Sequence, residues 1–220
     1  MIDLILDDCM NVMSKYEDNH FDLAIVDPPY GLDVDSWDIV KPTRPNYTKM
    51  VEQGYKKYKY KGWDKEIPKK EYFNELFRVS KNQIIWGGNY FTDFLYASRG
   101  WVYWNKGDSH IKSFNFSHGE LAWTSFKKRL LSYQISPFHN TRGGKDKIHP
   151  TEKPVKLYEW LLHNYAEKGQ KVLDTHLGSG SIAVAAHYFG VDLVGVEIDE
   201  EYYNKAKERV NELTKQETLF

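Results

Sequence analysis

An acid, two prolines and an aromatic side chain, Asp27-Pro28-Pro29-Tyr30, directly follow the short apolar run Leu23-Ala24-Ile25-Val26. Such a run is typical of a buried strand in a parallel sheet. Proline fixes φ and lacks an amide N–H, so the chain leaves the strand in a stiff, extended conformation. A carboxylate and a prolyl carbonyl held there can accept hydrogen bonds from an exocyclic amine while its ring stacks on the tyrosine. The pattern favours chemistry on a planar, amine-bearing group, and a surface turn that merely contains Asp and Pro is the alternative.

A second candidate site lies near the other end of the chain, where an expected strand leads into a glycine-containing turn. Gly178 and Gly180 lack a Cβ, so the backbone can approach a ligand closely there. The turn opens a helix, and the next expected strand ends at Glu197, whose carboxylate is placed to hold two ribose hydroxyls. Ala183 occupies the last glycine position of the dinucleotide fingerprint, so a dinucleotide is possible but not favoured. A purely structural strand–helix–strand unit is the alternative.

The elements that must position these residues alternate between strands and helices. Strands are expected at residues 2–6, 23–26, 83–86, 171–174 and 191–196, and helices at about 11–16, 71–79, 154–165, 182–189 and near the end of the chain. Two further strands, at 101–104 and 120–126, are expected to be antiparallel neighbours at one edge. The alternation predicts an α/β fold with a mostly parallel, doubly wound sheet and an antiparallel edge.

Composition limits the classes of protein to which the chain can belong. Its 220 residues are expected to form one domain over 1–220, because a chain of this length can bury a substantial core. The formal net charge of -1 gives no overall field that attracts nucleic acid, so such binding needs a local basic surface. A single cysteine, Cys9, excludes a disulfide framework and fits a reducing, cytoplasmic location. The eight histidines show no metal-ligand spacing, so no metal is predicted, and neither a signal peptide nor a membrane span is expected.

Two basic segments interrupt the regular pattern, at about residues 31–70 and 127–148. From Lys41 onward the first contains ten basic against three acidic residues, with tyrosines and a tryptophan interleaved. The second is expected to be irregular, with Arg142 at a loop tip. A long irregular segment inside a compact domain is usually functional or disordered. Lysines beside aromatic rings suit contacts with phosphates and bases, and a solvated lysine-rich flap is the alternative.

Together the motifs resemble those of the DNA amino-methyltransferases that use S-adenosylmethionine. Asp27-Pro28-Pro29-Tyr30 matches the catalytic motif of that family, and Asp174 to Ser181 matches its cofactor loop. His149-Pro150-Thr151-Glu152-Lys153-Pro154 is similar to the segment before the helix that closes over the methionine end of the cofactor. The catalytic motif precedes the cofactor loop, which resembles the permuted β-type order. The sequence departs from the family pattern at Asp7, His176 and Ser181.

The resemblance implies a Rossmann-like methyltransferase fold with Asp27, Pro28, Pro29 and Tyr30 as catalytic residues. A flipped adenine would stack on the tyrosine and present its amine to the carboxylate and the first prolyl carbonyl. Glu197 would bind ribose, Asp8 would lie near the adenine of the cofactor, and Lys153 would meet the cofactor's carboxylate. The residues that the resemblance places at the cofactor are Asp8, Cys9, Asp27, Thr151, Lys153, Asp174, His176, Gly178, Ser179, Gly180, Glu197 and Ile198.

The resemblance also implies macromolecular partners. Double-stranded DNA is expected to be bound by the basic segments and by the end of strand 83–86, through Lys56, Lys57, Lys59, Asn89, Tyr90 and Arg142. The last five residues resemble the peptide by which bacterial replication proteins dock on the DNA sliding clamp, with contacts from Gln216, Leu219 and Phe220, and a frayed tail is the alternative. A homodimer is compatible with the resemblance.

The target of the predicted reaction stays open at this point. Asp rather than Ser at position 27 favours adenine N6, on the resemblance alone, and cytosine N4 is the alternative. RNA or a protein glutamine is a less favoured substrate. An alternative of another class is a non-catalytic DNA- or clamp-binding module on the same fold, against which the intact Asp27, Tyr30 and Glu197 argue.

Overall fold

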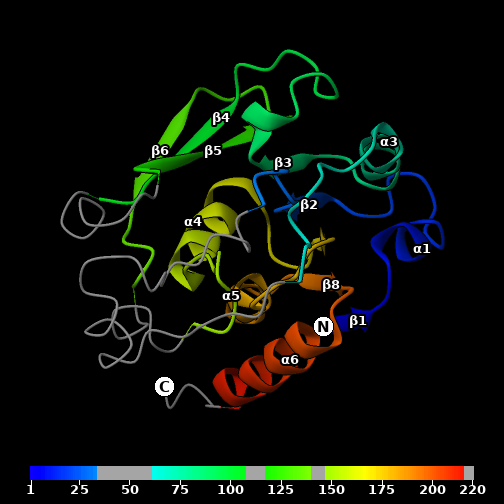
Figure 1. The fold of residues 1–220 in the computed structure, drawn as a ribbon, viewed down its shortest axis with the longest axis vertical. Helices are drawn as coiled ribbons and strands as arrows, with labels where there is room; N and C mark the ends of the chain where they lie inside the picture. The colour runs from blue at the N-terminus through cyan, green and yellow to red at the C-terminus, as the bar shows by residue number, and fades with distance from the viewer. Residues whose placement is uncertain (34–60, 108–116, 140–146, 216–220) are drawn as a thin grey trace.

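Strands and helices alternate along the chain in a computed structural model that describes residues 1–33, 61–107, 117–139 and 147–215 (Figure 1). In chain order the elements are β1 (Ile2–Leu6), α1 (Cys9–Met13), β2 (Leu23–Val26), α3 (Lys70–Val79), β3 (Gln83–Trp86), the 3-10 helix η2 (Gly88–Tyr90), β4 (Trp101–Asn105), β5 (Gly119–Thr124), β6 (Leu131–Gln134), α4 (Val155–Tyr165), β7 (Lys171–Asp174), α5 (Ser181–Phe189), β8 (Asp192–Glu197) and α6 (Glu200–Thr214).

The strands of the described residues form one sheet in the order β1-β8-β7-β2-β3-β5-β4-β6. The first five in this order are parallel, β5 is antiparallel to both of its neighbours, and β6 is parallel to β4. β2 and β7 are neighbours near the middle of the sheet. The chain continues from β2 to β3 toward one edge and from β7 to β8 toward the other edge, so the direction of winding reverses between β2 and β7. Open α/β sheets bind ligands beyond the carboxyl ends of their strands at such a reversal. Asp27 follows β2 there, and Asp174 ends β7.

Helices cover both faces of this sheet (Figure 1). Residues of α4, α5 and α6 share one buried cluster, and residues of α1 and α3 share the other. The side chains of β2 alternate between the two clusters, with Leu23 and Ile25 in the first and Ala24 and Val26 in the second. Because both faces of β2 are buried, its sequence is a continuous apolar run rather than an alternating one. The predicted fold class, a Rossmann-like α/β sheet with antiparallel strands beside the parallel ones, is confirmed.

The ends of the helices follow from local sequence. α4 begins directly after Pro154, whose ring fixes a φ of −64° and whose missing amide costs nothing at a helix start. Asp199 caps α6, because its carboxylate accepts a hydrogen bond from the backbone N–H of Tyr202 at 2.9 Å. α5 buries Ile182 through Ala186 without a break, as a helix against the centre of a sheet must.

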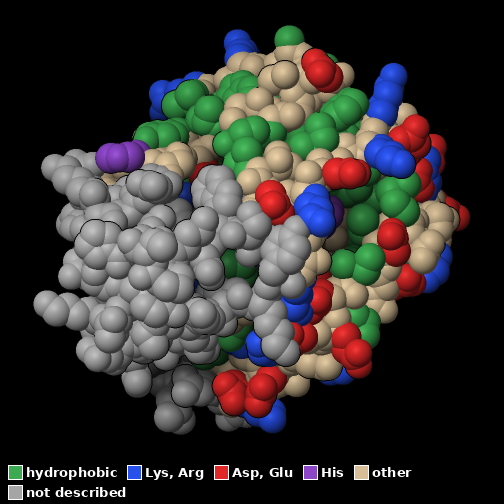
Figure 2. Space-filling model, viewed as in Figure 1, with side chains coloured by type: hydrophobic (Ala, Val, Ile, Leu, Met, Phe, Trp, Pro, Cys, Tyr) green, Lys and Arg blue, Asp and Glu red, His purple; other side chains and the backbone are tan. Residues whose placement is uncertain are grey.

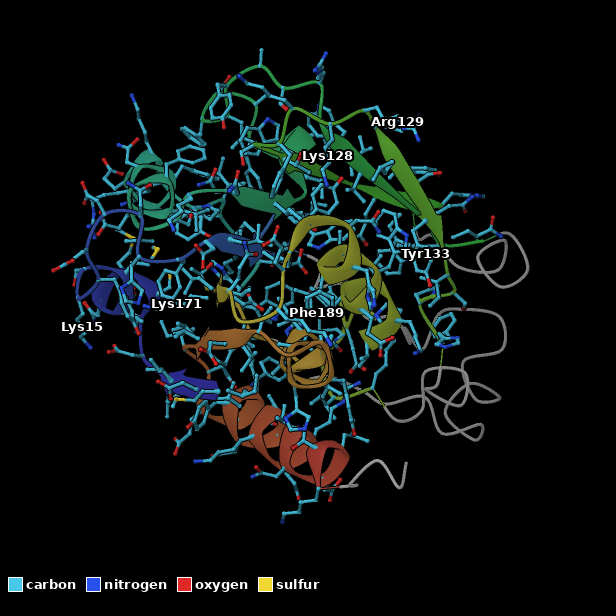
Figure 3. The ribbon with its side chains drawn as sticks, turned by 180° about the vertical axis from the view of Figure 1, so that it is seen from behind. Lys15, Lys128, Arg129, Tyr133, Lys171 and Phe189 are labelled. Atoms are coloured by element: carbon cyan, nitrogen blue, oxygen red, sulfur yellow. The ribbon has the colours of Figure 1, made fainter. Side chains whose placement is uncertain are left out.

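Two elements differ from the sequence-based expectations. α1 begins at Cys9 rather than near residue 11, because Asp8 caps it by accepting from the N–H of Met10 at 2.7 Å. β6 lies within the segment 127–148 that was expected to be irregular, and it moves β4 and β5 away from the edge of the sheet. Tyr133 of β6, which is labelled in Figure 3, stacks on Trp160 of α4 with ring centroids 5.1 Å apart, and this contact anchors the added strand.

Several predicted features lie outside the described residues. These are Lys56, Lys57, Lys59 and Arg142 of the basic segments and Gln216, Leu219 and Phe220 of the tail. Within the part of the chain that the structure describes, no helix is long and apolar enough to span a bilayer, and no three His, Cys, Asp or Glu side chains gather as metal ligands.

Candidate active site

The carboxylate of Asp27, at the carboxyl end of β2, is held by two donors. Its Oδ1 accepts a hydrogen bond from the Tyr30 hydroxyl at 2.6 Å, and its Oδ2 accepts one from Lys153 Nζ at 2.5 Å. Lys153 precedes α4, 126 residues further along the chain, and also donates to the Tyr30 hydroxyl at 3.4 Å. The structure therefore brings together two motifs that are far apart in sequence. Lys153 contacts the catalytic motif, whereas the sequence placed it at the cofactor.

The carboxylate of Asp64, which was not among the predicted site residues, fixes the turn after Asp27. Asp64 is buried, and its Oδ1 accepts hydrogen bonds from the backbone N–H groups of Tyr30 at 2.7 Å and Gly31 at 3.1 Å. Neither Pro28 nor Pro29 has an N–H to contribute, so these two amides are the first donors after the prolines. One carboxylate thus sets the direction in which Tyr30 leaves the turn.

Aromatic and glycine residues from the end of β3 surround the Tyr30 ring. Tyr90, which is exposed, stacks on it with ring centroids 5.1 Å apart and an interplanar angle of 18°. Gly87 adopts φ +68°, and a Cβ there would lie 2.2 Å from Cε1 of Tyr30. Of the two residues predicted to line the base site from this strand end, Tyr90 contacts the catalytic motif, and Asn89 is exposed beside it.

A second acid, Glu120 of β5, joins the same cluster. Its carboxylate forms ion pairs with Lys153 at 3.1 Å and with Lys106 at 2.5 Å. Burial raises the pKa of the Asp27 carboxyl, an effect that Lys153 opposes and Glu120 reinforces. At Glu120, burial is outweighed by the two lysines, and the pKa falls to about 2. Burial acts to lower the pKa of the Lys153 ammonium, but the two carboxylates raise it overall.

The predicted cofactor turn lies next to this cluster, between β7 and α5. Gly178 has φ +53°, and its N–H donates to Glu197 Oε2 at 2.8 Å. The other oxygen, Oε1, accepts from the N–H of Asp199 at 3.0 Å, so the carboxylate at the end of β8 is fixed by two backbone donors. Burial raises its pKa, which these hydrogen bonds oppose. The ring of His149 faces Gly178, 3.7 Å from where a Cβ would be.

Gly180 and Ser179 serve the packing of the turn. A Cβ on Gly180 would lie 3.2 Å from side-chain atoms of Ala206 and Val210, so its small size lets α6 approach. The Ser179 hydroxyl is paired with that of Ser181 at 3.0 Å, and its carbonyl accepts from Arg209 Nη1 at 3.0 Å. The sequence predicted that both glycines give a ligand room, and the structure shows that the space beside Gly180 is filled by α6.

Asp8 and Cys9 follow β1, and Ile198 follows β8, where the two strands end side by side. Leu6 is paired with Glu197 in the parallel ladder, which brings the following residues of both strands together. The Asp8 carboxylate caps α1, and burial raises the pKa of the Cys9 thiol to about 12, which makes it an unreactive packing residue. Ile198 is 69% exposed beside the Glu197 carboxylate, an apolar surface next to a polar group.

The remaining predicted cofactor residues are Asp174, His176 and Thr151. Asp174 is buried, accepts from the N–H of His176 at 3.0 Å, and has a pKa that burial raises to about 8. Burial lowers the pKa of His176 to about 4, and its Nδ1 lies 2.9 Å from the Thr175 hydroxyl. Thr151 is exposed, with its hydroxyl 3.1 Å from His149 Nδ1.

Sequence reasoning missed Glu120, Lys106 and Asp64. Glu120 lies in β5 and Lys106 directly follows the antiparallel neighbour β4, and only the register, in which Trp104 faces Glu120, brings their side chains together. Asp64 lies in the first basic segment as one of few acids there. An acid in a lysine-rich segment was the available signal, and its partners are two backbone amides, which cannot be recognised from the types of the side chains.

Comparisons with known proteins decide the family. A family model described as DNA methylase, of the N6/N4 type, matches residues 41–208, which is most of the chain. The chain belongs to this family of DNA methylases. The type II methyltransferase M.HpaI of Haemophilus parainfluenzae is 25% identical over 236 residues, which cover 94% of this chain and 74% of that protein. The predicted family and its cofactor, S-adenosylmethionine, are thereby confirmed.

Solved structures of this class share the fold of the chain. The complex of M1.HpyAVI with its cofactor aligns with a TM-score of 0.59 at 17% identity and covers 96% of this chain and 100% of its own. The cytosine-N4-specific PvuII DNA methyltransferase aligns with a TM-score of 0.58 at 12% identity over 98% of this chain and 92% of its own. At such identities the likeness establishes the architecture, and the site must be argued from the residues of this chain.

Proposed function

We propose that this DNA methylase transfers a methyl group from S-adenosylmethionine to the N6 amine of a flipped adenine in double-stranded DNA. The observation that carries the proposal is the position of Asp27 and Tyr30, a hydrogen-bonded acid and ring at the winding reversal of the sheet. The glycine turn and Glu197 follow neighbouring strands at the same ends. An acceptor for an amine and a candidate nucleoside site thus lie side by side.

The residues around Glu197 fit the nucleoside part of the cofactor. The Glu197 carboxylate is fixed by two backbone donors and keeps lone pairs for two ribose hydroxyls. Ile198 offers an exposed apolar face for a purine ring, and Asp8 lies across from it at the end of β1. Gly178 adopts a left-handed conformation that presents its backbone without a Cβ. Thr151, Asp174, His176 and Ser179 lie around the turn as predicted cofactor contacts.

Asp27 is placed to direct the reaction. S-adenosylmethionine supplies a sulfonium methyl group, whose transfer leaves a neutral thioether and turns the acceptor nitrogen into a cation that then loses a proton. The Asp27 carboxylate and the Pro28 carbonyl accept hydrogen bonds from the amine and orient its lone pair. The same carboxylate stabilises the developing positive charge and takes the proton. The ring of the target base stacks on Tyr30. Tyr90, which stacks on Tyr30 in this structure, either contacts the base or moves aside for it.

Adenine is proposed over cytosine because Asp27 stands at the motif position that favours adenine within the family. Cytosine N4 is the second candidate, since the PvuII enzyme with the same architecture is specific for it and either amine suits the same acceptors. The alternative of another class, a non-catalytic DNA- or clamp-binding module, predicts that S-adenosylmethionine does not bind. Calorimetry with the full chain separates it from the enzyme.

The test is mass spectrometry of nucleosides from unmethylated DNA incubated with the chain and methyl-labelled S-adenosylmethionine. We expect labelled N6-methyladenine, and we expect it to vanish with Asp27→Ala. Labelled N4-methylcytosine would keep the mechanism and overturn the choice of base. An absence of labelled nucleosides on DNA of varied sequence would overturn the proposed function.

DNA contacts outside the site belong to the same proposal. On the face shown in Figure 2, acidic and basic side chains of the described residues are interspersed. We assign phosphate contacts to the lysines of the segments 31–70 and 127–148, base contacts or the gap left by the flipped base to Arg142, and the lining of the base site to Asn89 and Tyr90. Clamp docking through the terminal peptide, a homodimer and a cytoplasmic location stay predictions of the sequence. Deletion of residues 216–220 should abolish binding to an isolated clamp, and unchanged affinity would contradict the docking prediction.

A further inference from the structure

Four charged side chains form one connected group around the Asp27 carboxylate. Lys153 Nζ contacts Asp27 at 2.5 Å and Glu120 at 3.1 Å, and Lys106 Nζ contacts the other oxygen of Glu120 at 2.5 Å. The chain Asp27–Lys153–Glu120–Lys106 contains two acids and two bases. Its formal charge is zero.

This group differs from the ion pairs on the surface. The side chain of Lys153 is 2% exposed and that of Lys106 is 11% exposed, with Asp27 and Glu120 near 20%. At the surface, water screens such pairs and they contribute little. In a buried site the same charges interact strongly, so removing one leaves its partners unbalanced. The charge of Asp27 therefore depends on residues that it does not touch.

Separate parts of the fold supply the group. Asp27 follows β2, Glu120 lies in β5, Lys106 follows β4, and Lys153 precedes α4. The antiparallel pairing of β4 and β5 fixes Lys106 beside Glu120 independently of the catalytic turn. Lys106 also lies over the Trp104 ring, 5.0 Å from its centroid, which holds the ammonium in place. The arrangement is a rigid support for Lys153.

We infer that Glu120 and Lys106 are positioning residues for methyl transfer, which act through Lys153 to keep the group around Asp27 electrically neutral. The inference rests on the proposed function, because methyl transfer moves a positive charge from the sulfonium onto the amine beside Asp27. A neutral group leaves the carboxylate available to that charge. A group with a net positive charge repels the positive charge that develops on the amine, and a group with a net negative charge favours a protonated Asp27.

The two residues therefore have opposite effects on Asp27. Glu120→Gln gives the group a charge of +1 and stabilises the carboxylate anion, so the pKa of Asp27 falls. Lys106→Gln gives a charge of -1, so the pKa of Asp27 rises. The double variant is neutral again. Other titratable groups that interact with the cluster stay the same in all variants, and these are Tyr30, Tyr72, Lys147, His149, Tyr158 and Asp174.

The first measurement is a carbon-13 NMR titration of the aspartate carboxyls in the full chain without cofactor or DNA, with Asp27→Asn to assign the signal. We expect Glu120→Gln to lower the Asp27 midpoint by about one pH unit and Lys106→Gln to raise it by a similar amount. The double variant should return to the starting midpoint. Shifts of the same sign in both single variants, or no return in the double variant, would overturn the inference.

The second measurement is the single-turnover rate of methyl transfer against pH. Each single variant should lose about tenfold or more at neutral pH, and the double variant should recover most of that loss. A merely structural role predicts that the double variant is the worst of the three. The matched control is Glu159→Gln with Lys156→Gln, an exposed ion pair on α4 at 2.6 Å, which should change neither readout.

The two measurements separate the inference from the proposed function. If the unaltered chain transfers no methyl group to DNA, the proposed function fails and the role of Glu120 and Lys106 in transfer fails with it. The titration then still decides whether the two residues set the charge of Asp27. If the chain transfers methyl groups and the titration shows no opposite shifts, only the inference is overturned. Thermal unfolding of every variant is measured to check that each substitution leaves the fold intact.

Discussion

The Tyr30 side chain combines two functions that substitutions can separate. On the proposed function its ring carries the surface on which the target base stacks, and its hydroxyl donates to Asp27 at 2.6 Å. Tyr30→Phe keeps the ring and removes the donor, so we expect the transfer rate to fall about tenfold or more while DNA affinity is kept. Tyr30→Ala removes both and should also weaken DNA binding. Single-turnover rates and fluorescence of 2-aminopurine at the target position measure the two functions.

The comparison between these variants is informative in either direction. The hydrogen bond from the hydroxyl is charge-assisted, and such bonds contribute more than neutral ones. If Tyr30→Phe weakened DNA binding as much as Tyr30→Ala does, stacking on the ring would not hold the base. If Tyr30→Phe kept the full rate, the hydroxyl would have no part in orienting Asp27.

At the scale of an element, the turn after β3 limits where the Tyr30 ring can lie. Gly87 has φ +68° and leaves no space for a Cβ, which would come within 2.2 Å of the ring. We expect Gly87→Ala to lower the free energy of unfolding by about 1 kcal/mol or more through its left-handed backbone, and to displace Tyr30 as well. The rate of methyl transfer should then fall by a larger factor than the loss of stability alone would cause.

A matched glycine separates these two effects. Gly169 has φ +83°, and no atom lies within 4 Å of where its Cβ would be, so Gly169→Ala carries the backbone strain alone. Gly87→Ala should lose more stability than Gly169→Ala in chemical denaturation, because the contact with Tyr30 adds to the backbone strain, and Gly169→Ala should keep the transfer rate. Equal rates in the two variants would show that the close contact with Tyr30 has no role in the reaction.

Elements with a strong local signal could be predicted from sequence, and contacts made through the sheet could not. The run at 23–26 is apolar throughout because both faces of β2 are buried, and the Pro154 start of α4 follows from proline geometry. β6 was missed because two of its four residues are exposed, the other two are only half buried, and the strand follows a basic run. The ion pair between Glu120 and Lys106 depends on strand register, which no local pattern encodes.

At the scale of the whole molecule, the buried Asp174 links the cofactor turn to the stability of the fold. Its pKa is raised to about 8 in the folded chain from an ordinary value of 3.8. Between these pH values the folded state keeps a proton that the unfolded state releases, so stability falls as pH rises through this range. Below the lower value both states are protonated and the effect vanishes.

Asp174→Asn should therefore stabilise the protein at neutral pH. Asparagine keeps an acceptor for the N–H of His176 and carries no charge to bury. The gain should be on the order of a few kcal/mol near pH 8 and close to zero near pH 4. Thermal unfolding from pH 4 to 8 measures it, and a gain that does not depend on pH would contradict the argument. Cofactor affinity, measured in parallel, tests whether the stabilised variant loses function.

The return of the chain at residues 61–64 has a consequence for how such an enzyme can diversify. The Asp33 N–H donates to the Asp64 carbonyl at 2.7 Å, so the two ends of the stretch 34–60 are joined to each other. Lys61 is paired with Asp199 at 2.6 Å and lies over the Tyr202 ring, which fixes the same end to the nucleoside side of the site. Because a longer chain between two fixed ends costs little additional closure entropy, insertions between residues 33 and 61 should leave the turn after Asp27 in place. On the proposed function, substitutions in this stretch would change the target sequence while Asp27 and Tyr30 stay the same.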